Sequence, residues 1–271
     1  MNSWSKREVL KIGIAQYEIN PQNPEYNLSK IEAFLKEAQK DILILPEMGI
    51  TGYWLEKIKE YLKEVPHYIE VLKKYSLKYS TSICTTLPYK EGESVYNRLF
   101  FITPDGFYHY DKHYLIDWGG FHEGSFFQHG KGYLVTSYFG WIVGFAVCYD
   151  LRFPEHFYYM NQYSYDNYQR FMHLILLPSQ WPSQRREHFL TLSKARAIEN
   201  QAYFVAVNNI GNLKELSFSG DSRIYDPNGN EILCLNSEEG VFVQELSLEL
   251  VKEIQTQRPI LKDRYKIYLH Q

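Results

Sequence analysis

The stretch Gly144-Phe145-Ala146-Val147-Cys148-Tyr149-Asp150-Leu151-Arg152-Phe153-Pro154-Glu155 decides the expected fold. The residues from Trp141 onward are almost wholly apolar, and this run stops at Cys148. A short unbroken apolar run is typical of a strand buried on both faces. Pro154 and Glu155 then favour the start of a helix. The sequence therefore predicts Cys148 at the carboxyl end of a central strand, where open α/β sheets bind ligands.

The order strand, helix, strand, helix, strand occurs twice, which predicts an α/β fold of two pseudo-repeated halves. Asn27 is expected to cap the first helix, and two separate helical segments are expected at 55–64 and 68–79. Pro104-Asp105-Gly106 and Asn228-Gly229 are expected to turn hairpins. Later helices are expected from about Glu155 and at about 185–200. The expected strands are 9–17, 42–45, 82–87, 96–102, 107–112, 133–138, 141–148, 173–177, 202–207, 222–226, 231–235 and 241–246.

Length and composition favour one large domain over residues 1–271, with its core at about 9–246 and a C-terminal helix and tail at 247–271. The formal net charge is −3 and the basic residues are dispersed, which argues against nucleic acid as a partner. No apolar run is long enough to span a membrane, and the polar start Met1–Arg7 does not resemble a signal peptide. We therefore expect no membrane partner.

Cysteine usage indicates a reducing compartment, so we expect a cytoplasmic protein. The three cysteines, Cys84, Cys148 and Cys234, lack the spacing of a disulfide framework or a zinc site. Cys84 and Cys234 fall within expected strands and are predicted to be core residues. Cys148 could also be a buried core residue, because free cysteine is often buried. A nucleophilic thiol needs a base or a cation nearby, so its neighbours decide between these roles.

Three ionisable side chains follow apolar segments in the same way as Cys148. Glu47 follows Leu45-Pro46 and could accept the thiol proton, although an acid there could also be solvated. Lys112 ends a hairpin strand and could stabilise a thiolate or an oxyanion, or lie on the surface. Glu123 lies in the Gly- and aromatic-rich loop 114–131, where an acid is more often solvated than catalytic. A loop of that length is more often functional than idle.

The nine histidines leave one alternative open. None has metal-ligand spacing, so we expect no metal site. A Cys–His pair between Cys148 and His122, His156 or His188 remains possible, but no local signature supports it.

Three segments together resemble the signature regions of the nitrilase superfamily, the carbon–nitrogen hydrolases. They are Leu45–Tyr53 (LPEMGITGY), Tyr110-Asp111-Lys112 and Val147–Glu155 (VCYDLRFPE). Further matches are Leu177–Pro182 (LPSQWP), Ala195–Asn200 (ARAIEN) and Gly220-Asp221-Ser222. The resemblance runs in order from about residue 9 to 246, and it is closest to the ω-amidase and aliphatic amidase branches.

The resemblance implies an αββα sandwich with a Glu–Lys–Cys triad that pairs as a homodimer or a larger homo-oligomer. Glu47 would be the general base and Cys148 the nucleophile, while Lys112 and the backbone N–H of Tyr149 would hold the oxyanion. The loop Gly120–Glu123 resembles the place where the family keeps a second, substrate-orienting glutamate, here Glu123. Candidate substrate-binding residues are Tyr53, Arg152 and Trp181. Arg152 could bind a substrate carboxylate or be a structural ion-pair partner.

The expected reaction is hydrolysis of a non-peptide C–N bond in a small amide, through a thioester and with release of ammonia, without metal or organic cofactor. The alternatives are an N-carbamoyl amine or amino-acid hydrolase, a nitrilase, or a catalytically idle binding protein of the same fold. A low pKa of the Cys148 thiol would favour an enzyme over the idle protein. Two departures from the family pattern, Tyr114 in a usual His position and Asn209 in a usual Arg position, leave substrate choice open.

Overall fold

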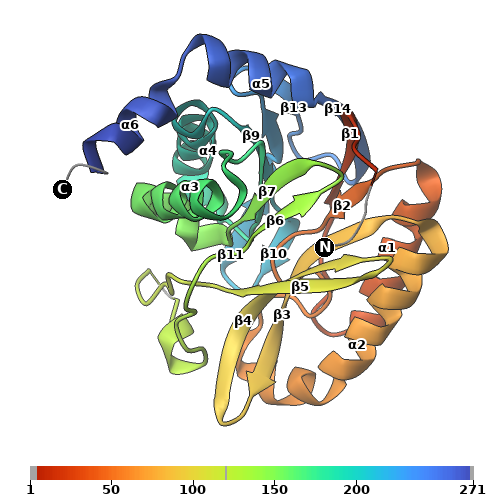
Figure 1. The fold of residues 1–271 in the computed structure, drawn as a ribbon. Helices are drawn as coiled ribbons and strands as arrows, with labels where there is room; N and C mark the ends of the chain where they lie inside the picture. Colours follow the sequence, from red (N-terminus) through yellow and green to blue (C-terminus); the bar gives the residue numbers. More distant parts are fainter. Residues whose placement is uncertain (1–4, 120, 269–271) are drawn as a thin grey trace.

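The computed structural model describes residues 5–119 and 121–268. The first four residues of the polar N-terminal segment, and Gly120 of the predicted glutamate loop, lie outside the described residues. The chain forms two six-stranded sheets that pack face to face, with helices on both outer sides, so the predicted αββα sandwich is confirmed (Figure 1).

The first sheet has the strand order β14-β1-β2-β3-β4-β5. Strands β1, β2 and β3 run parallel, while β4, β5 and β14 pair antiparallel with their neighbours. Helices α1 and α2 connect the parallel strands and lie on the outer side of this sheet (Figure 1). The bounds are β1 Val9–Gln16, α1 Pro24–Glu37, β2 Ile42–Ile44, η1 Leu55–Lys57, α2 Ile58–Tyr79, β3 Ser82–Glu91, β4 Ser94–Thr103, β5 Gly106–Asp111, η2 Glu123–Ser125 and β14 Gly240–Ser247.

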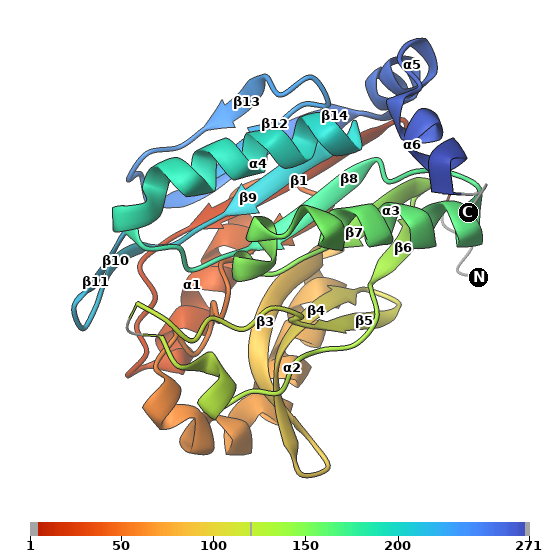
Figure 2. The ribbon, with the colours of Figure 1, turned by 90° about the vertical axis from the view of Figure 1, so that its left-hand side faces the viewer.

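The second sheet repeats this plan with the strand order β13-β12-β9-β8-β7-β6. Its central strands β7, β8 and β9 run parallel, with α3 and α4 on the outer side. The bounds are β6 Val135–Tyr138, β7 Trp141–Phe145, η3 Cys148–Arg152, α3 Pro154–Tyr168, β8 Leu174–Pro178, η4 Ser183–Arg185, α4 Arg186–Asn200, β9 Tyr203–Val207, β12 Arg223–Tyr225 and β13 Glu231–Cys234. The hairpin β10 Ile210–Leu213 and β11 Leu216–Ser219 lies at the opposite end of the molecule from α5 Leu248–Gln257 and α6 Ile260–Tyr268 (Figure 2).

The core lies between the two sheets, because their central strands are apolar on both faces. Every residue of β2, β7, β8 and β9 is buried. One apolar cluster joins residues such as Ile12 and Ile44 of the first sheet to Phe145 and Leu176 of the second. A second cluster, with Leu28 and other residues of α1 and α2, covers the outer face of the first sheet. Such burial of whole strands is typical of parallel sheets covered on both sides.

Two predictions about the first helices are wrong. Asn23, rather than Asn27, caps α1, since its side chain accepts a hydrogen bond from Tyr26 N at 3.0 Å. Asn27 is instead buried and donates to the Ile50 carbonyl at 2.7 Å. The two predicted helical segments are not separate, since residues 58–79 form the single helix α2, which follows η1 and continues through Pro66. Pro66 is exposed, and the apolar face of the helix continues across it.

Other differences concern strand ends. The predicted strand 141–148 ends at Phe145, and Cys148 begins the 3₁₀ helix η3. Cys234 is exposed on β13, so its assignment to the core is wrong, while Cys84 is buried as predicted. Both predicted hairpin turns are confirmed, since β4 pairs with β5 and β12 pairs with β13.

Among the described residues, no helix is both long enough and apolar enough to span a membrane.

Candidate active site

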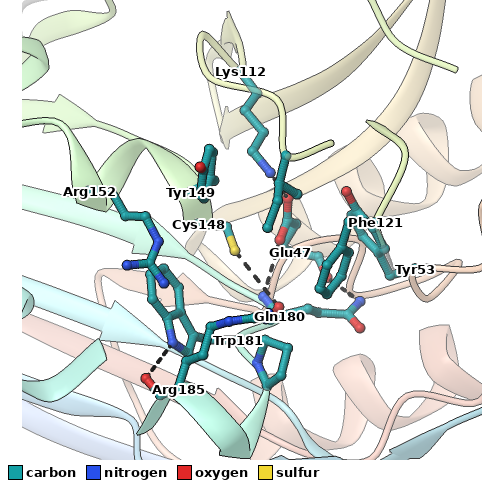
Figure 3. A pocket seen from close by; sticks show the side chains of 12 residues that line it. Glu47, Tyr53, Lys112, Phe121, Cys148, Tyr149, Arg152, Gln180, Trp181 and Arg185 are labelled. Atoms are coloured by element: carbon teal, nitrogen blue, oxygen red, sulfur yellow. Dashed lines mark hydrogen bonds and ion pairs between the residues drawn. The ribbon is translucent and has the colours of Figure 1, made fainter. Parts of the chain in front are cut away.

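The carboxyl ends of strands from both sheets meet at one place. Glu47 follows β2, Lys112 follows β5, and Cys148 follows β7. The segment after β8 crosses to the first sheet, because the Glu47 N–H donates to the Ser179 carbonyl at 3.2 Å. Four segments that are far apart in the sequence therefore surround one cavity (Figure 3).

Lys112 binds two glutamates inside the protein. Its Nζ lies 3.0 Å from Glu47 Oε1, and 2.9 and 3.0 Å from the two carboxylate oxygens of Glu123. All three side chains are at most 1% exposed. Glu123 is the first residue of the 3₁₀ helix η2, and the Ile116 N–H holds its carboxylate in place by donating to Oε2 at 2.8 Å. The structure therefore brings together three of the four predicted reactive side chains through direct contacts.

The charges in this cluster determine the pKa values of its members. Burial alone would lower the pKa of Lys112, but the carboxylates of Glu123 and Glu47 outweigh burial and raise it well above its usual value. Burial raises the pKa of Glu123, and the nearby ammonium of Lys112 only partly opposes this effect. Lys112 is thus held as a cation between two acids, one of which resists ionisation.

Two further side chains fix Glu47. Asn97 on β4 donates through Nδ2 to Glu47 Oε1 at 2.7 Å. The backbone N–H of Gln180 donates to Glu47 Oε2 at 3.1 Å, and its side-chain amide donates to the Glu47 carbonyl at 2.8 Å. Both carboxylate oxygens therefore accept hydrogen bonds, which holds the group at one orientation toward the cavity (Figure 3).

Cys148 lies beside this cluster in a strained backbone conformation. Its φ is 43°, a region that costs non-glycine residues about 1–2 kcal/mol. The side chain is 8% exposed, and its thiol donates to the Gln180 carbonyl at 3.8 Å. Because Cys148 and Tyr149 are the first two residues of η3, the helix itself provides no acceptor for their N–H groups. The sulfur and the Tyr149 N–H are thus both near the start of the same 3₁₀ helix.

The pKa of the Cys148 thiol does not follow the pattern expected of a preformed thiolate. Burial raises it well above its usual value, Glu47 raises it further, and Lys112 only partly opposes them. The low pKa that would mark an enzyme is therefore absent from this resting state, and the thiol is neutral. A neutral thiol with a carboxylate in the same cavity requires proton transfer at the moment of attack.

Two arginines line the cavity on the side opposite Phe121 and Tyr53 (Figure 3). The Arg152 guanidinium lies 4.7 Å from the centre of the Trp181 ring, and Arg185 lies 4.4 Å from that of Trp118. Within residues 5–119 and 121–268, no carboxylate forms an ion pair with either arginine, so Arg152 is not the structural ion-pair partner considered above.

The other predicted substrate-binding residues also line the cavity. Tyr53 is 8% exposed, and its hydroxyl has no hydrogen-bond partner in the described part of the chain. Burial, followed by the charges of Glu123 and Glu47, raises the pKa of Tyr53 well above its usual value. Trp181 is held by Asn208, whose Oδ1 accepts from Trp181 N at 2.7 Å. Both aromatic residues therefore present fixed surfaces to a bound molecule.

The two departures from the family pattern lie around the site. Tyr114 stacks on Phe153 with ring centres 3.7 Å apart. Asn209 is buried, and its Oδ1 has no partner among the described residues. Tyr114 thus contributes packing next to the segment that carries Cys148.

The Cys–His alternative receives no support. In the part of the chain that the structure describes, no histidine forms a hydrogen bond with Cys148 Sγ. His156 instead contacts His113, with their Nδ1 atoms 3.2 Å apart, and His188 contacts Arg152. The described residues also contain no group of His, Cys, Asp and Glu side chains suited to a metal ion.

Comparison with known proteins identifies the family. The sequence model of the family described as "Carbon-nitrogen hydrolase" matches residues 11–256. This chain belongs to the carbon–nitrogen hydrolases. The hydrolase is 32% identical to the Omega-amidase YafV of Yersinia enterocolitica, over 96% of this chain and 98% of that one. It is 28% identical to the 2-oxoglutaramate amidase of Bacillus subtilis, over 93% and 96% of the two chains.

Solved structures agree with this assignment. XC1258 from Xanthomonas campestris, a CN-hydrolase superfamily protein with an arsenic adduct in its active site, superimposes with a TM-score of 0.88 at 28% identity, over 95% of this chain and 97% of that one. Nit3 of Saccharomyces cerevisiae shares the fold with a TM-score of 0.84 at 21% identity, over 96% and 97%. The hydrolase therefore acts on carbon–nitrogen bonds other than peptide bonds, and family and relatives alike support cysteine-dependent amide hydrolysis.

Sequence reasoning missed several residues of this site. Asn97 lies in the middle of β4 without any motif of its own, and Arg185 lies in a segment whose letters carry no readable pattern. Gln180 was visible only as one letter of a family motif. The remaining signal for these residues was their position just after, or opposite, an apolar strand that ends at the site.

Proposed function

We propose that this carbon–nitrogen hydrolase cleaves a small amide through a thioester on Cys148. The observation that carries the proposal is the buried contact of Lys112 with Glu47 and Glu123, in which Lys112 and Glu47 line the same cavity as Cys148. This arrangement supplies a nucleophile, a base and a cation without any metal ion.

In the first step, Glu47 accepts the proton of the Cys148 thiol as the sulfur attacks the amide carbonyl carbon. The carbonyl oxygen becomes an oxyanion, which the Lys112 ammonium and the Tyr149 N–H stabilise. Glu47 then gives its proton to the departing nitrogen, so that ammonia leaves and a thioester remains. Glu123 holds Lys112 in place and is available to orient the substrate amide.

In the second step, Glu47 accepts a proton from a water molecule while the water oxygen attacks the thioester carbon. The carbon–sulfur bond breaks, the acid product forms, and the proton returns from Glu47 to the sulfur. Each proton that Glu47 takes up is released again within the cycle, so the hydrolase returns to its starting state.

We also propose that the substrate carries a carboxylate. Arg152 and Arg185 line the cavity and have no acidic partner among the described residues, and burial lowers the pKa of Arg152. A carboxylate could satisfy both guanidinium groups through charge-assisted hydrogen bonds. Two relatives are named omega-amidase and 2-oxoglutaramate amidase. These names support a dicarboxylic acid monoamide as the substrate.

The test measures ammonia release from a dicarboxylic acid monoamide by the wild-type protein and by Cys148→Ala. The variant should lose activity, while Cys234→Ala, which removes an exposed cysteine away from the cavity, should keep it. Mass spectrometry of wild type quenched during turnover should find the acyl group on Cys148 alone. Full activity in Cys148→Ala would end the proposal.

The carboxylate is tested separately with Arg152→Gln and Arg185→Gln. Loss of one hydrogen bond to a charged group should raise KM for the monoamide about 10- to 100-fold. KM for an uncharged amide of the same length should change little. Equal changes for both substrates would contradict the carboxylate and leave the thioester mechanism standing.

Three further expectations stay proposals, namely a homodimer or larger homo-oligomer, a cytoplasmic location and the predicted domain boundaries. Light scattering of the purified protein tests the first of them, and a monomer mass would contradict it.

A further inference from the structure

Behind Cys148 lies a carboxylate for which the proposed reaction has no direct use. Asp150 is fully buried and accepts three hydrogen bonds. Its Oδ2 accepts from Val147 N and from the Tyr110 hydroxyl, both at 2.9 Å, and its Oδ1 accepts from Tyr114 N at 3.0 Å. Both oxygens are therefore needed to satisfy three donors.

These donors belong to the two segments that carry reactive groups. Val147 directly precedes Cys148, and Tyr110 and Tyr114 flank Lys112 on either side. The Tyr110 hydroxyl also accepts from the N–H of His113, the residue after Lys112, at 3.1 Å. One carboxylate thus connects the turn of the nucleophile to both sides of the residue that carries the ammonium.

Both segments need such a connection. Cys148 has a positive φ, which persists only where the surroundings hold it. The backbone of Lys112 is tied to the first sheet by its bond to the Asn97 carbonyl at 3.0 Å, whereas η3 follows β7 of the second sheet. Asp150 links the two through hydrogen bonds, beside the stacking of Tyr114 on Phe153.

We propose that Asp150 is a positioning residue that fixes the Cys148 sulfur relative to the Lys112 ammonium. The inference rests on the proposed roles of these two residues. It gives a role to a buried carboxyl group whose pKa burial raises, an effect that the Tyr114 N–H, the Lys112 ammonium and the Val147 N–H only partly offset. A neutral amide has one acceptor oxygen, so it would leave the N–H of either Val147 or Tyr114 unpaired.

The test is Asp150→Asn, assayed for kcat, for KM and for the rate at which iodoacetamide alkylates Cys148. Displacement of reacting groups by about 1 Å can cost about 10²-fold in rate, so kcat should fall by about that factor while KM stays nearly unchanged. Alkylation should also change in rate, because it reports the sulfur directly. The stacking of Tyr114 on Phe153 should keep the two segments together in the variant.

The control is Asn161→Ala on α3, which removes buried hydrogen bonds away from the cavity. Asn161 accepts from Met172 N at 3.0 Å and donates to Asn200 Oδ1 at 2.8 Å. This variant should lose stability but keep kcat and the alkylation rate. A similar loss of kcat in both variants would reduce Asp150 to a structural role and overturn the proposal.

If Asp150→Asn does not fold, Tyr110→Phe provides the same test, because it removes one donor to Asp150 and leaves the two backbone donors. Its kcat should fall with KM nearly unchanged. Wild-type kcat in a folded Asp150→Asn or Tyr110→Phe protein would overturn the positioning role. The proposed function would be unaffected by that result, since it depends on the loss of activity in Cys148→Ala.

Discussion

Replacing Glu47 by glutamine tests the chemistry with almost no change of shape. Glu47 Oε1 accepts from Lys112 at 3.0 Å and from Asn97 at 2.7 Å, and Oε2 accepts from Gln180 N at 3.1 Å. An amide oxygen can replace Oε1, but the amide NH₂ then faces the N–H of Gln180. One buried donor without an acceptor costs about 1–3 kcal/mol, so the variant should be less stable by about that amount.

The effect on catalysis should be much larger than the effect on stability. Loss of a general base typically costs about 10²–10⁴-fold, and Glu47 is used in both half-reactions. We therefore expect kcat for ammonia release from a monoamide to fall by at least about 10²-fold. Glu70 is an exposed glutamate on α2 that pairs with Lys73. Glu70→Gln is therefore the matched control, and its kcat should equal that of the wild type.

Glu47→Gln should make the Cys148 thiol ionise more easily even though it lowers kcat. Burial and then the charge of Glu47 raise the pKa of Cys148, so removing that charge should lower the pH midpoint of alkylation by iodoacetamide. A variant with a lower kcat and a more easily ionised thiol would show that Glu47 acts as a base and not only as a structural residue. Near wild-type kcat, or an unchanged midpoint, would refute this reasoning.

Two more predictions concern buried lysines. Lys112→Met removes one partner of a buried ion-pair cluster, which should cost about 3–5 kcal/mol of unfolding free energy as well as about 10²–10³-fold in kcat. Burial raises the pKa of Glu123 and the Lys112 ammonium opposes this, so removing the ammonium should raise that pKa further and the loss of stability should grow as the pH rises. Urea unfolding of both proteins at pH 5.5 and 8 measures this, and an equal loss at both pH values would contradict it. Burial lowers the pKa of Lys40 from 10.5 to about 8, so the unfolded state binds more protons between these values and stability should rise with pH across that window. The difference in unfolding free energy between wild type and Lys40→Met, measured at pH 7.5, 9 and 10.5, should therefore increase, and a constant difference would refute the burial effect.

The fold could be predicted largely from apolar strands. Segments such as 42–45 and 174–177 are apolar throughout, and the structure buries them on both faces as that pattern indicates. The helix through Pro66 could not be predicted in this way, because the outcome depends on whether proline faces solvent. Local rules state that proline lacks an N–H, but only the packed structure shows that Pro66 lies on the exposed side of the helix.

The candidate site was predictable where a side chain follows a strand. Glu47, Lys112 and Cys148 all follow strands whose carboxyl ends lie at the same edge of their sheets, so their proximity follows from topology. Asn97 and Asp150 were not predictable by the same argument, because their roles come from hydrogen bonds across segments that are 50 and 40 residues apart in sequence. Polar residues of this kind carry no periodic signal.

Burial first, and then the charges around the cavity, raise the pKa of the Cys148 thiol. Lys112 lies between two glutamates, and all three side chains are at most 1% exposed. Releasing the Cys148 proton to solvent would add a negative charge beside these acids, whereas passing it to Glu47 leaves the total charge of the site unchanged. A site of this kind therefore favours transfer within the cavity over a preformed thiolate. The sulfur can then remain neutral until a carbonyl is positioned to receive its electrons, and the Lys112 charge is released toward the oxyanion as Glu47 becomes protonated.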